Sequence, residues 1–329
     1  MSYIAVIGAG SWGTTLACLL HEKGYDVSLW AREKEVADEI TNQNTNGVYF
    51  PGVLLPEGLM ATSSIAEALT NARYILNVVP TQFIRSVFTE AVKYISSDTI
   101  IISASKGIEQ GTLLTASETL QEITQKPVAA LSGPSFAKEV IKKLPTAVTL
   151  ASPNMDTALL LQELFNTNYF RVYSHADIIG VELGGALKNV AAIASGICDG
   201  LDLGHNARAA LITRGLVEIT RLGKAMGADP MTFSGLSGLG DLVLTCTGPL
   251  SRNYTVGVNL GKGMKLRDIL ASTRSVAEGV ATSLSAFELA QKRHVEMPIV
   301  EQVYRVLHED EDPETAVLNL MNRALKSEF

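Results

Sequence analysis

One lysine in this 329-residue sequence lies in an unusual setting for a charged side chain. Lys188 is inside a long apolar segment, and a helix there would bring the positions three, four and seven residues away onto its face. Each mid-helix glycine costs about 1 kcal/mol relative to alanine, so adjacent glycines on this face indicate close approach of a backbone or a ligand. Lys188 is therefore the first candidate for a catalytic group, with helix packing and an amine that reaches solvent as the alternative. Its neighbours on the face are Val181, Gly184, Gly185, Ala191, Ala192 and Ser195.

Polar side chains also follow two predicted strands at the point where each strand ends. Lys106 lies in Ser103-Ala104-Ser105-Lys106-Gly107, directly after an apolar run, and Ser132-Gly133-Pro134-Ser135 follows the next run. Ligands of open α/β sheets bind outside the carboxyl ends of the strands. We expect Lys106 and the polar groups of the second turn to meet a small polar substrate. A solvated lysine and an ordinary turn are the alternatives.

A third candidate region combines an acid with an arginine. The motifs Gly238-Leu239-Gly240-Asp241 and Ser251-Arg252-Asn253 bracket one loop. The planar guanidinium of Arg252 can hold a phosphate through two parallel hydrogen bonds. Asp241 can bond substrate hydroxyls or orient Lys188. Taken alone, either motif is as well explained by a turn or a helix cap.

The elements that must position these groups begin with a glycine turn near the N-terminus. Gly8, Gly10 and Gly13 have G-x-G-x-x-G spacing, after an apolar run and before a helical pattern. In a dinucleotide fold these glycines permit, in order, a tight turn, close approach of a pyrophosphate, and close packing of helix on strand. The helix N-terminus adds free N–H groups and the positive end of its dipole. The pattern favours dinucleotide binding over a purely structural turn.

The end of the next predicted strand bears on the choice of cofactor. Residues 25–32 are strand-like and end at Arg32, with Glu33 just beyond. An acidic residue at this point accepts hydrogen bonds from the ribose hydroxyls of NAD, whereas an arginine accommodates the 2′-phosphate of NADP. We expect NADP(H) to be preferred, with NAD(H) usable through Glu33. The alternative is that Arg32 is a solvated strand end.

Composition limits the class of protein. The net charge is −7, so the chain lacks the basic footprint of a nucleic-acid-binding protein. Three widely spaced cysteines without metal-binding spacing are typical of reduced thiols, and no signal-peptide pattern begins the chain, so we expect a cytoplasmic protein. The apolar stretch 178–198 contains Glu182, Lys188 and Asn189, which favours a buried core helix over a membrane span. Residues 199–206 lack the full calcium-loop pattern, so we expect a turn there and no metal.

Apolar strands alternate with helical patterns through the first half of the chain. Continuous apolar strands separated by helices indicate a parallel sheet with both faces covered. The predicted strands lie at 3–7, 25–32, 61–62, 74–79, 99–103, 128–131, 147–151 and 172–174. The predicted helices lie at 14–20, 33–44, 65–70, 83–95 and 111–125.

The pattern becomes helical after His175, with no convincing series of strands. We therefore expect an α/β domain of Rossmann type at 1–176, joined directly to an all-α domain at 177–329. The active site should lie in the cleft between them. The predicted helices are 177–198, 207–226, 276–292, 298–307 and 313–324, the last with Asp312 as its N-cap and Pro313 at its first position.

The segment around Lys188 resembles a signature of the NAD(P)-dependent glycerol-3-phosphate dehydrogenases, soluble bacterial type. It reads Gly184-Gly185-Ala186-Leu187-Lys188-Asn189-Val190-Ala191-Ala192. The likeness covers almost the whole chain in order, through segments 8–13, 105–107, 132–135, 209–216, 240–242 and 251–253, with no departure at a motif position. The family's fold, a Rossmann-type domain followed by a helical domain, agrees with the fold predicted above.

The resemblance implies reversible reduction of dihydroxyacetone phosphate to sn-glycerol 3-phosphate, the backbone precursor of phospholipids. It implies that Lys188 donates and accepts the proton, and that the protein is a homodimer. The implied substrate contacts are Lys106, Gly133, Ser135, Lys188, Asp241, Ser251, Arg252 and Asn253. Besides the three glycines of the turn (Gly8, Gly10 and Gly13), the implied cofactor contacts are Ser11, Trp12, Arg32, Lys106, Ala137, Arg252, Val276 and Glu278.

Two other functions fit parts of the pattern. One is a related NADPH-dependent reductase that acts on another small phosphorylated or carboxylated ketone. The other is a dinucleotide-sensing protein without activity, which would not need Lys188 on a small-residue face. Turnover with dihydroxyacetone phosphate or ketopantoate would distinguish the three.

Overall fold

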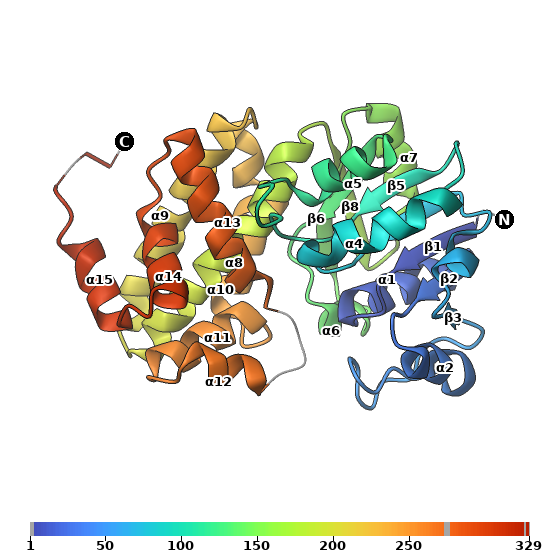
Figure 1. The fold of residues 1–329 in the computed structure, drawn as a ribbon, viewed down its shortest axis with the longest axis horizontal. Coiled ribbons are helices and arrows are strands. Elements are labelled where there is room, and N and C mark those ends of the chain that lie inside the picture. Colours follow the sequence, from blue (N-terminus) through green and yellow to red (C-terminus); the bar gives the residue numbers. More distant parts are fainter. Residues whose placement is uncertain (1–2, 273–276, 326, 329) are drawn as a thin grey trace. The chain divides into compact units, whose positions relative to one another are not determined.

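The computed structural model describes residues 3–272, 277–325 and 327–328. The chain divides into two compact units (Figure 1). The first contains Met1–Lys106 and Leu114–Glu182, and the second contains Gly107–Leu113 and Leu183–Phe329. The division at Glu182 lies a few residues beyond the predicted boundary at 176, and the short loop Gly107–Leu113 belongs to the second unit.

The first unit is built on one eight-stranded sheet with the order β3-β2-β1-β4-β5-β6-β7-β8. All neighbouring strands are parallel except β6 and β7, which are antiparallel. The strands are β1 (Tyr3–Ile7), β2 (Asp26–Trp30), β3 (Met60–Thr62), β4 (Tyr74–Asn77), β5 (Ile100–Ser103), β6 (Val128–Ser132), β7 (Thr146–Ala151) and β8 (Phe170–His175).

The direction of β7 corrects the expectation of a fully parallel sheet. A parallel connection needs a crossover of about a dozen residues or more, usually with a helix that spans the sheet. The segment between β6 and β7 contains only the four-residue helix α6 (Ala137–Val140). The chain therefore turns back beside β6 rather than crossing over, and β7 runs in the opposite direction.

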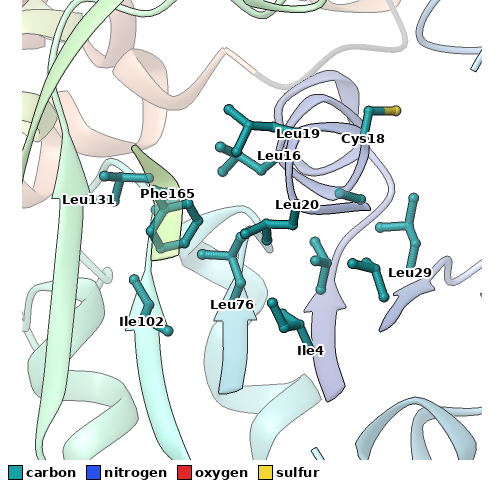
Figure 2. Packing of buried hydrophobic residues seen from close by; sticks show 14 of the residues in the cluster. Ile4, Leu16, Cys18, Leu19, Leu20, Leu29, Leu76, Ile102, Leu131 and Phe165 are labelled. Atoms are coloured by element: carbon teal, nitrogen blue, oxygen red, sulfur yellow. The ribbon is translucent and has the colours of Figure 1, made fainter. Parts of the chain in front are cut away.

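Helices cover both faces of the sheet, as predicted. Alternate residues of β1 enter two different hydrophobic clusters, because successive side chains of a strand point to opposite faces. In one cluster, leucines of α1 (Ser11–Glu22) pack over β1, β4 and β5 (Figure 2). This cluster also takes in residues of α2 (Lys34–Gln43) and α7 (Met155–Phe165). The other cluster contains residues of α3 (Ile65–Leu69), α4 (Thr81–Ala91) and α5 (Ala116–Thr124).

The second unit is helical, and its described residues contain no strand, which confirms the predicted all-α class. The helix α8 (Ile178–Gly200) begins in the first unit and continues into the second from Leu183. It is long and apolar enough to cross a membrane, but 89% of its most apolar window is buried inside the protein. It is therefore a core helix. The remaining helices are α9 (Gly204–Ala225), α10 (Asp241–Thr247), α11 (Arg252–Gly261), α12 (Leu266–Ala271), α13 (Glu278–Arg293), α14 (Pro298–His308) and α15 (Pro313–Met321), with short helical turns η2 (Pro230–Ser234) and η3 (Leu236–Gly240). Asp312 caps α15 as predicted, and its carboxylate accepts from the N–H of Thr315.

Candidate active site

The glycine turn between β1 and α1 has the geometry that its spacing predicts. Gly8 has φ +119°, a conformation that other residues rarely adopt. A Cβ on Gly13 would lie 1.8 Å from the carbonyl oxygen of Gly8, so only glycine lets α1 start so close to the strand. A Cβ on Gly10 would meet no atom within 4 Å, so the turn is open on that side. The open side and the N-terminus of α1 together fit a pyrophosphate.

Three further residues of the predicted cofactor set lie in the same unit. The indole of Trp12 packs near Phe170, and the carbonyl oxygen of Ala137 accepts a 3.4 Å hydrogen bond from Thr15 of α1. Arg32, just after β2, is exposed and pairs with Glu33 at 2.7 Å. An exposed ion pair contributes only about 0–1 kcal/mol, so this contact leaves the guanidinium able to turn to another anion.

The two motifs that follow β5 and β6 come together. The ammonium of Lys106 donates a 3.0 Å hydrogen bond to the carbonyl oxygen of Gly133, and the hydroxyl of Ser135 donates to the same oxygen at 2.9 Å. Gly133 has φ +141°, and a Cβ there would lie 2.9 Å from the Cα of Val148 in β7. The glycine is therefore required both by its conformation and by the neighbouring antiparallel strand.

Asn77, which the sequence analysis missed, supports the Lys106 loop. Its buried side chain lies at the end of β4 and donates to the hydroxyls of Ser103 and Ser105 at 3.2 and 3.0 Å. The hydroxyl of Ser105 in turn donates to the carbonyl oxygen of Val79. The sequence feature that indicates Asn77 is its position as a polar residue at the end of an otherwise apolar strand.

Lys188 is buried in the second unit rather than exposed to solvent. Its ammonium lies 2.5 Å from Oδ1 of Asp241 and donates to the hydroxyl of Thr245 at 2.8 Å. The two charged side chains are 8% and 1% exposed. Of the two roles considered for Asp241, orienting Lys188 is the one that this geometry supports. Thr245 was missed, although it lies one helical turn after Asp241 and so shares its face.

Backbone packing explains Gly184, the first of the two adjacent glycines, and the glycines where α8 meets α11. A Cβ on Gly184 would lie 2.4 Å from the carbonyl oxygen of Ser237 in η3, the turn that leads directly into Asp241. A Cβ on Gly196 would lie 2.1 Å from the carbonyl oxygen of Tyr254, and a Cβ on Gly257 would lie 2.0 Å from that of Ile193. The absence of side chains thus brings η3 and α11 against α8.

The Ser251-Arg252-Asn253 motif begins α11. The hydroxyl of Ser251 accepts from the N–H of Tyr254 and caps the helix, so the cap interpretation of this motif holds for Ser251. Oδ1 of the buried Asn253 accepts a 3.0 Å hydrogen bond from the N–H of Gly279, next to Glu278 at the start of α13. Arg252 occupies the first position of α11 and is exposed. Val276, an implied cofactor contact, lies outside the described residues.

The predicted site residues thus form separate groups in the two units. The first unit contains the glycine turn, Arg32, Lys106, Gly133, Ser135 and Ala137. The second unit contains Lys188, Asp241, Ser251, Arg252, Asn253 and Glu278. The expected location of the active site in a cleft between the domains stays a prediction. The turn expected at 199–206 is shorter in the structure, because Asp199 and Gly200 end α8 and α9 begins at Gly204. The carboxylate of Asp199 pairs with Arg208 at 2.7 Å and accepts a hydrogen bond from the hydroxyl of Tyr254.

A glycine turn on a Rossmann-type sheet and a buried lysine–aspartate pair in a helical unit are typical of two-domain nicotinamide-dependent dehydrogenases. Comparison with known proteins identifies the family. Residues 3–158 match the profile for the N-terminus of NAD-dependent glycerol-3-phosphate dehydrogenase, and residues 177–318 match the profile for its C-terminus. The chain belongs to the NAD-dependent glycerol-3-phosphate dehydrogenase family.

Individual relatives are similar over their full lengths. A glycerol-3-phosphate dehydrogenase [NAD(P)+] of Citrifermentans bemidjiense is 55% identical over 99% of this chain and 98% of its own. A protein of the same name from Geobacter sulfurreducens is 54% identical over the same shares of the two chains. The crystal structure of glycerol-3-phosphate dehydrogenase from Coxiella burnetii matches with a TM-score of 0.94 and 44% identity, covering 98% of this chain and 99% of its own.

Proposed function

We propose that this chain catalyses the reversible reduction of dihydroxyacetone phosphate to sn-glycerol 3-phosphate with a nicotinamide dinucleotide. The reaction would supply the backbone of phospholipids in the cytoplasm. The observation that carries the proposal is the buried pair of Lys188 and Asp241, at 2.5 Å, in a chain that belongs to this family. A charged pair kept from solvent suits a reaction in which charge develops on a carbonyl oxygen.

The cofactor, when bound, supplies a hydride to the carbonyl carbon at C2 of the substrate. The first unit's residues would hold it: the open side of the Gly8–Gly13 turn and the N–H groups of α1 fit the pyrophosphate. The proposed cofactor contacts are completed by residues of both units. They are Ser11, Trp12, Arg32, Lys106 and Ala137 of the first unit, and Arg252, Val276 and Glu278 of the second. For Val276 the support is the family resemblance alone.

Lys188 would supply the proton and stabilise the negative charge that develops during the reduction. Its ammonium would stabilise the carbonyl oxygen as negative charge grows there, and would then give it a proton. Asp241 and Thr245 hold the ammonium in place through the contacts at 2.5 and 2.8 Å. In the reverse direction the neutral amine takes the proton from the hydroxyl of the product.

Substrate binding is the task of the remaining polar groups. Arg252 would hold the phosphate through its planar guanidinium, because an acidic protein needs a local cation to bind an anion. Lys106, Gly133 and Ser135 lie together at the ends of β5 and β6, and Ser251 and Asn253 flank the arginine. The hydrogen bond to Gly279 fixes the orientation of the Asn253 amide, so that its Nδ2 has a defined direction.

Two finer points belong to the proposal. NADPH is preferred over NADH because Arg32 binds its 2′-phosphate. Glu33 can accept hydrogen bonds from the ribose hydroxyls of NADH. The protein is a homodimer, as the family resemblance implies, and light scattering measures this directly.

The test is oxidation of NADPH by the purified chain with dihydroxyacetone phosphate, and with ketopantoate as the competing substrate. Lys188→Ala should lower kcat at least about 100-fold while the cofactor still binds. Lys224→Ala, which removes an exposed lysine of α9, is the matched control. Turnover of ketopantoate alone would favour the related reductase, and cofactor binding without any turnover would favour a sensor.

A further inference from the structure

Asn46 is a fully buried polar side chain in the segment that follows α2, 36 positions after Gly10 in the sequence. Its Nδ2 donates to the carbonyl oxygen of Ala9 at 3.0 Å and to the hydroxyl of Thr14 at 2.9 Å. The first contact falls on the turn between β1 and α1, and the second on the first turn of α1. None of the motifs singled out in the sequence includes this residue.

The carbonyl of Ala9 receives two hydrogen bonds in this arrangement. The first comes from Asn46, and the second comes from the hydroxyl of Thr14 at 3.2 Å. A carbonyl oxygen has two lone pairs, so both are occupied. Because the peptide group is planar, fixing this carbonyl fixes the plane of the peptide that joins Ala9 to Gly10.

That peptide is the link between the tight turn at Gly8 and the first residue of α1. Gly10 is the N-cap of α1 and has extended backbone angles. The N–H groups of the first turn of α1 follow directly, and they are the donors that a helix offers to phosphates. The hydrogen bonds from Asn46 and Thr14 hold the carbonyl of Ala9 toward buried side chains, whereas a Cβ on Gly10 would enter open space.

The segment that carries Asn46 is itself held in place. Oε1 of Glu39, on α2, accepts from the hydroxyl of Thr45 at 2.8 Å and from the N–H of Gly47 at 2.7 Å, on either side of Asn46. The carbonyl oxygen of Asn46 accepts from the N–H of Phe50 at 2.7 Å. The amide therefore reaches the turn from a fixed position.

The other end of the amide argues against a packing role alone. Oδ1 of Asn46 is buried and has no hydrogen-bond partner among the described residues. An unsatisfied buried acceptor is costly, and an apolar side chain would fill the same space without that cost. The amide is therefore explained by the hydrogen bonds that its two N–H groups donate to Ala9 and Thr14.

We propose that Asn46 is a positioning residue for the dinucleotide: it fixes the Ala9–Gly10 peptide so that the start of α1 is preorganised for the pyrophosphate. Asn46 does not itself touch the cofactor in this proposal. The inference rests on the proposed use of a dinucleotide cofactor, and it adds a residue that the family resemblance did not supply.

The experiment measures the dissociation constants of NADPH and NADH for Asn46→Ala and for Thr14→Val. Asn46→Ala should raise both constants about tenfold, since tenfold corresponds to about 1.4 kcal/mol and the hydrogen bonds to Ala9 and Thr14 are lost. The ratio of the two constants should stay the same, because both cofactors share the pyrophosphate. At saturating cofactor, kcat and the KM for dihydroxyacetone phosphate should change less than about twofold.

Thr14→Val should also raise both dissociation constants. In the double variant the constants should rise by less than the product of the two single-variant factors, because the two side chains share one carbonyl. The control is Asn154→Ala, which removes the cap of α7 elsewhere in the same unit. It should lower Tm and leave both dissociation constants unchanged.

Three results would overturn the proposal: a folded Asn46→Ala variant with wild-type constants, an effect on NADPH alone, or a large fall in kcat at saturating cofactor. If Asn46→Ala does not fold, Thr14→Val decides by the same measurements. Failure of the wild-type chain to bind either cofactor would instead refute the proposed function.

Discussion

Replacing Asp241 with asparagine removes the negative charge beside Lys188 with almost no change in shape. Oδ1 of Asp241 lies 2.5 Å from the ammonium, and both side chains are nearly inaccessible to solvent, at 1% and 8% exposed. The amide oxygen of asparagine can still accept a hydrogen bond from the lysine. The substitution therefore tests the charge of Asp241 and leaves the packing in place.

The size of the effect follows from the burial of the pair. Removing one partner of a buried ion pair costs about 3–5 kcal/mol, because the other charge is left without compensation. We expect about 3 kcal/mol, the lower end, since asparagine keeps an acceptor for the ammonium. This is a large part of a typical free energy of unfolding of about 5–15 kcal/mol. We also expect kcat to fall at least about 100-fold, because a neutral amide oxygen holds the ammonium less firmly than a carboxylate does.

Urea unfolding and initial rates with dihydroxyacetone phosphate measure the two effects. Asp268→Asn is the matched control, because its carboxylate pairs with Arg267 at 3.3 Å on an exposed surface of the same unit. That pair should contribute less than about 1 kcal/mol, and its loss should leave kcat unchanged. If Asp241→Asn matched this control in both measurements, the inference that Asp241 orients a charged Lys188 would be refuted.

Three further predictions concern phosphate, cofactor and pH. Arg252→Lys should raise the KM for dihydroxyacetone phosphate, because an ammonium cannot reproduce the two parallel hydrogen bonds of a guanidinium; an unchanged KM would argue against a phosphate contact. Arg32→Ala should lower the ratio of kcat/KM for NADPH to that for NADH by up to about tenfold to a hundredfold, less if solvent screens the contact, and an unchanged ratio would leave Arg32 as a solvated strand end. Burial raises the pKa of Glu182 from 4.5 to about 7, although hydrogen bonds from Ser117 and Thr115 oppose the shift. The native chain then holds a proton that the unfolded chain has released, so the free energy of unfolding should fall between about pH 4.5 and about pH 7, by at most about 1.4 kcal/mol per pH unit. Glu182→Gln should flatten this fall in urea titrations, and an unaltered slope would show that Glu182 is not its source.

The sequence was sufficient for features that depend on local pattern. The spacing of Gly8, Gly10 and Gly13 predicted a turn whose positive φ and close contacts the structure contains. The adjacent glycines near Lys188 predicted close approach of a backbone or a ligand, and in the structure the backbone of η3 lies against Gly184. The N-cap of α15 at Asp312 followed from the order of Asp and Pro.

Features that depend on distant partners could not be predicted in the same way. The direction of β7 is set by a connection with too little helix to cross the sheet, and apolar content does not distinguish parallel from antiparallel strands. Asn46 and Thr14 are 32 positions apart, and nothing in the local composition of either segment indicates their hydrogen bond. The choice between the two roles of Asp241 also required the fold, because its partner lies 53 positions away.

The small-residue face of α8 explains why these distant partners meet. Gly184, Lys188, Ala192, Gly196 and Gly200 follow one another at intervals of four and therefore form one row along the helix. The first glycine lets the backbone of η3 approach, which brings Asp241 to the lysine, and the last two lie against the backbone of α11, which begins at Arg252. Backbone contacts leave no rotamers to vary, so the positions of these helices are set by main-chain geometry. The glycines that weaken α8 as an isolated helix are thus what allow its lysine to be held by an acid from a different segment.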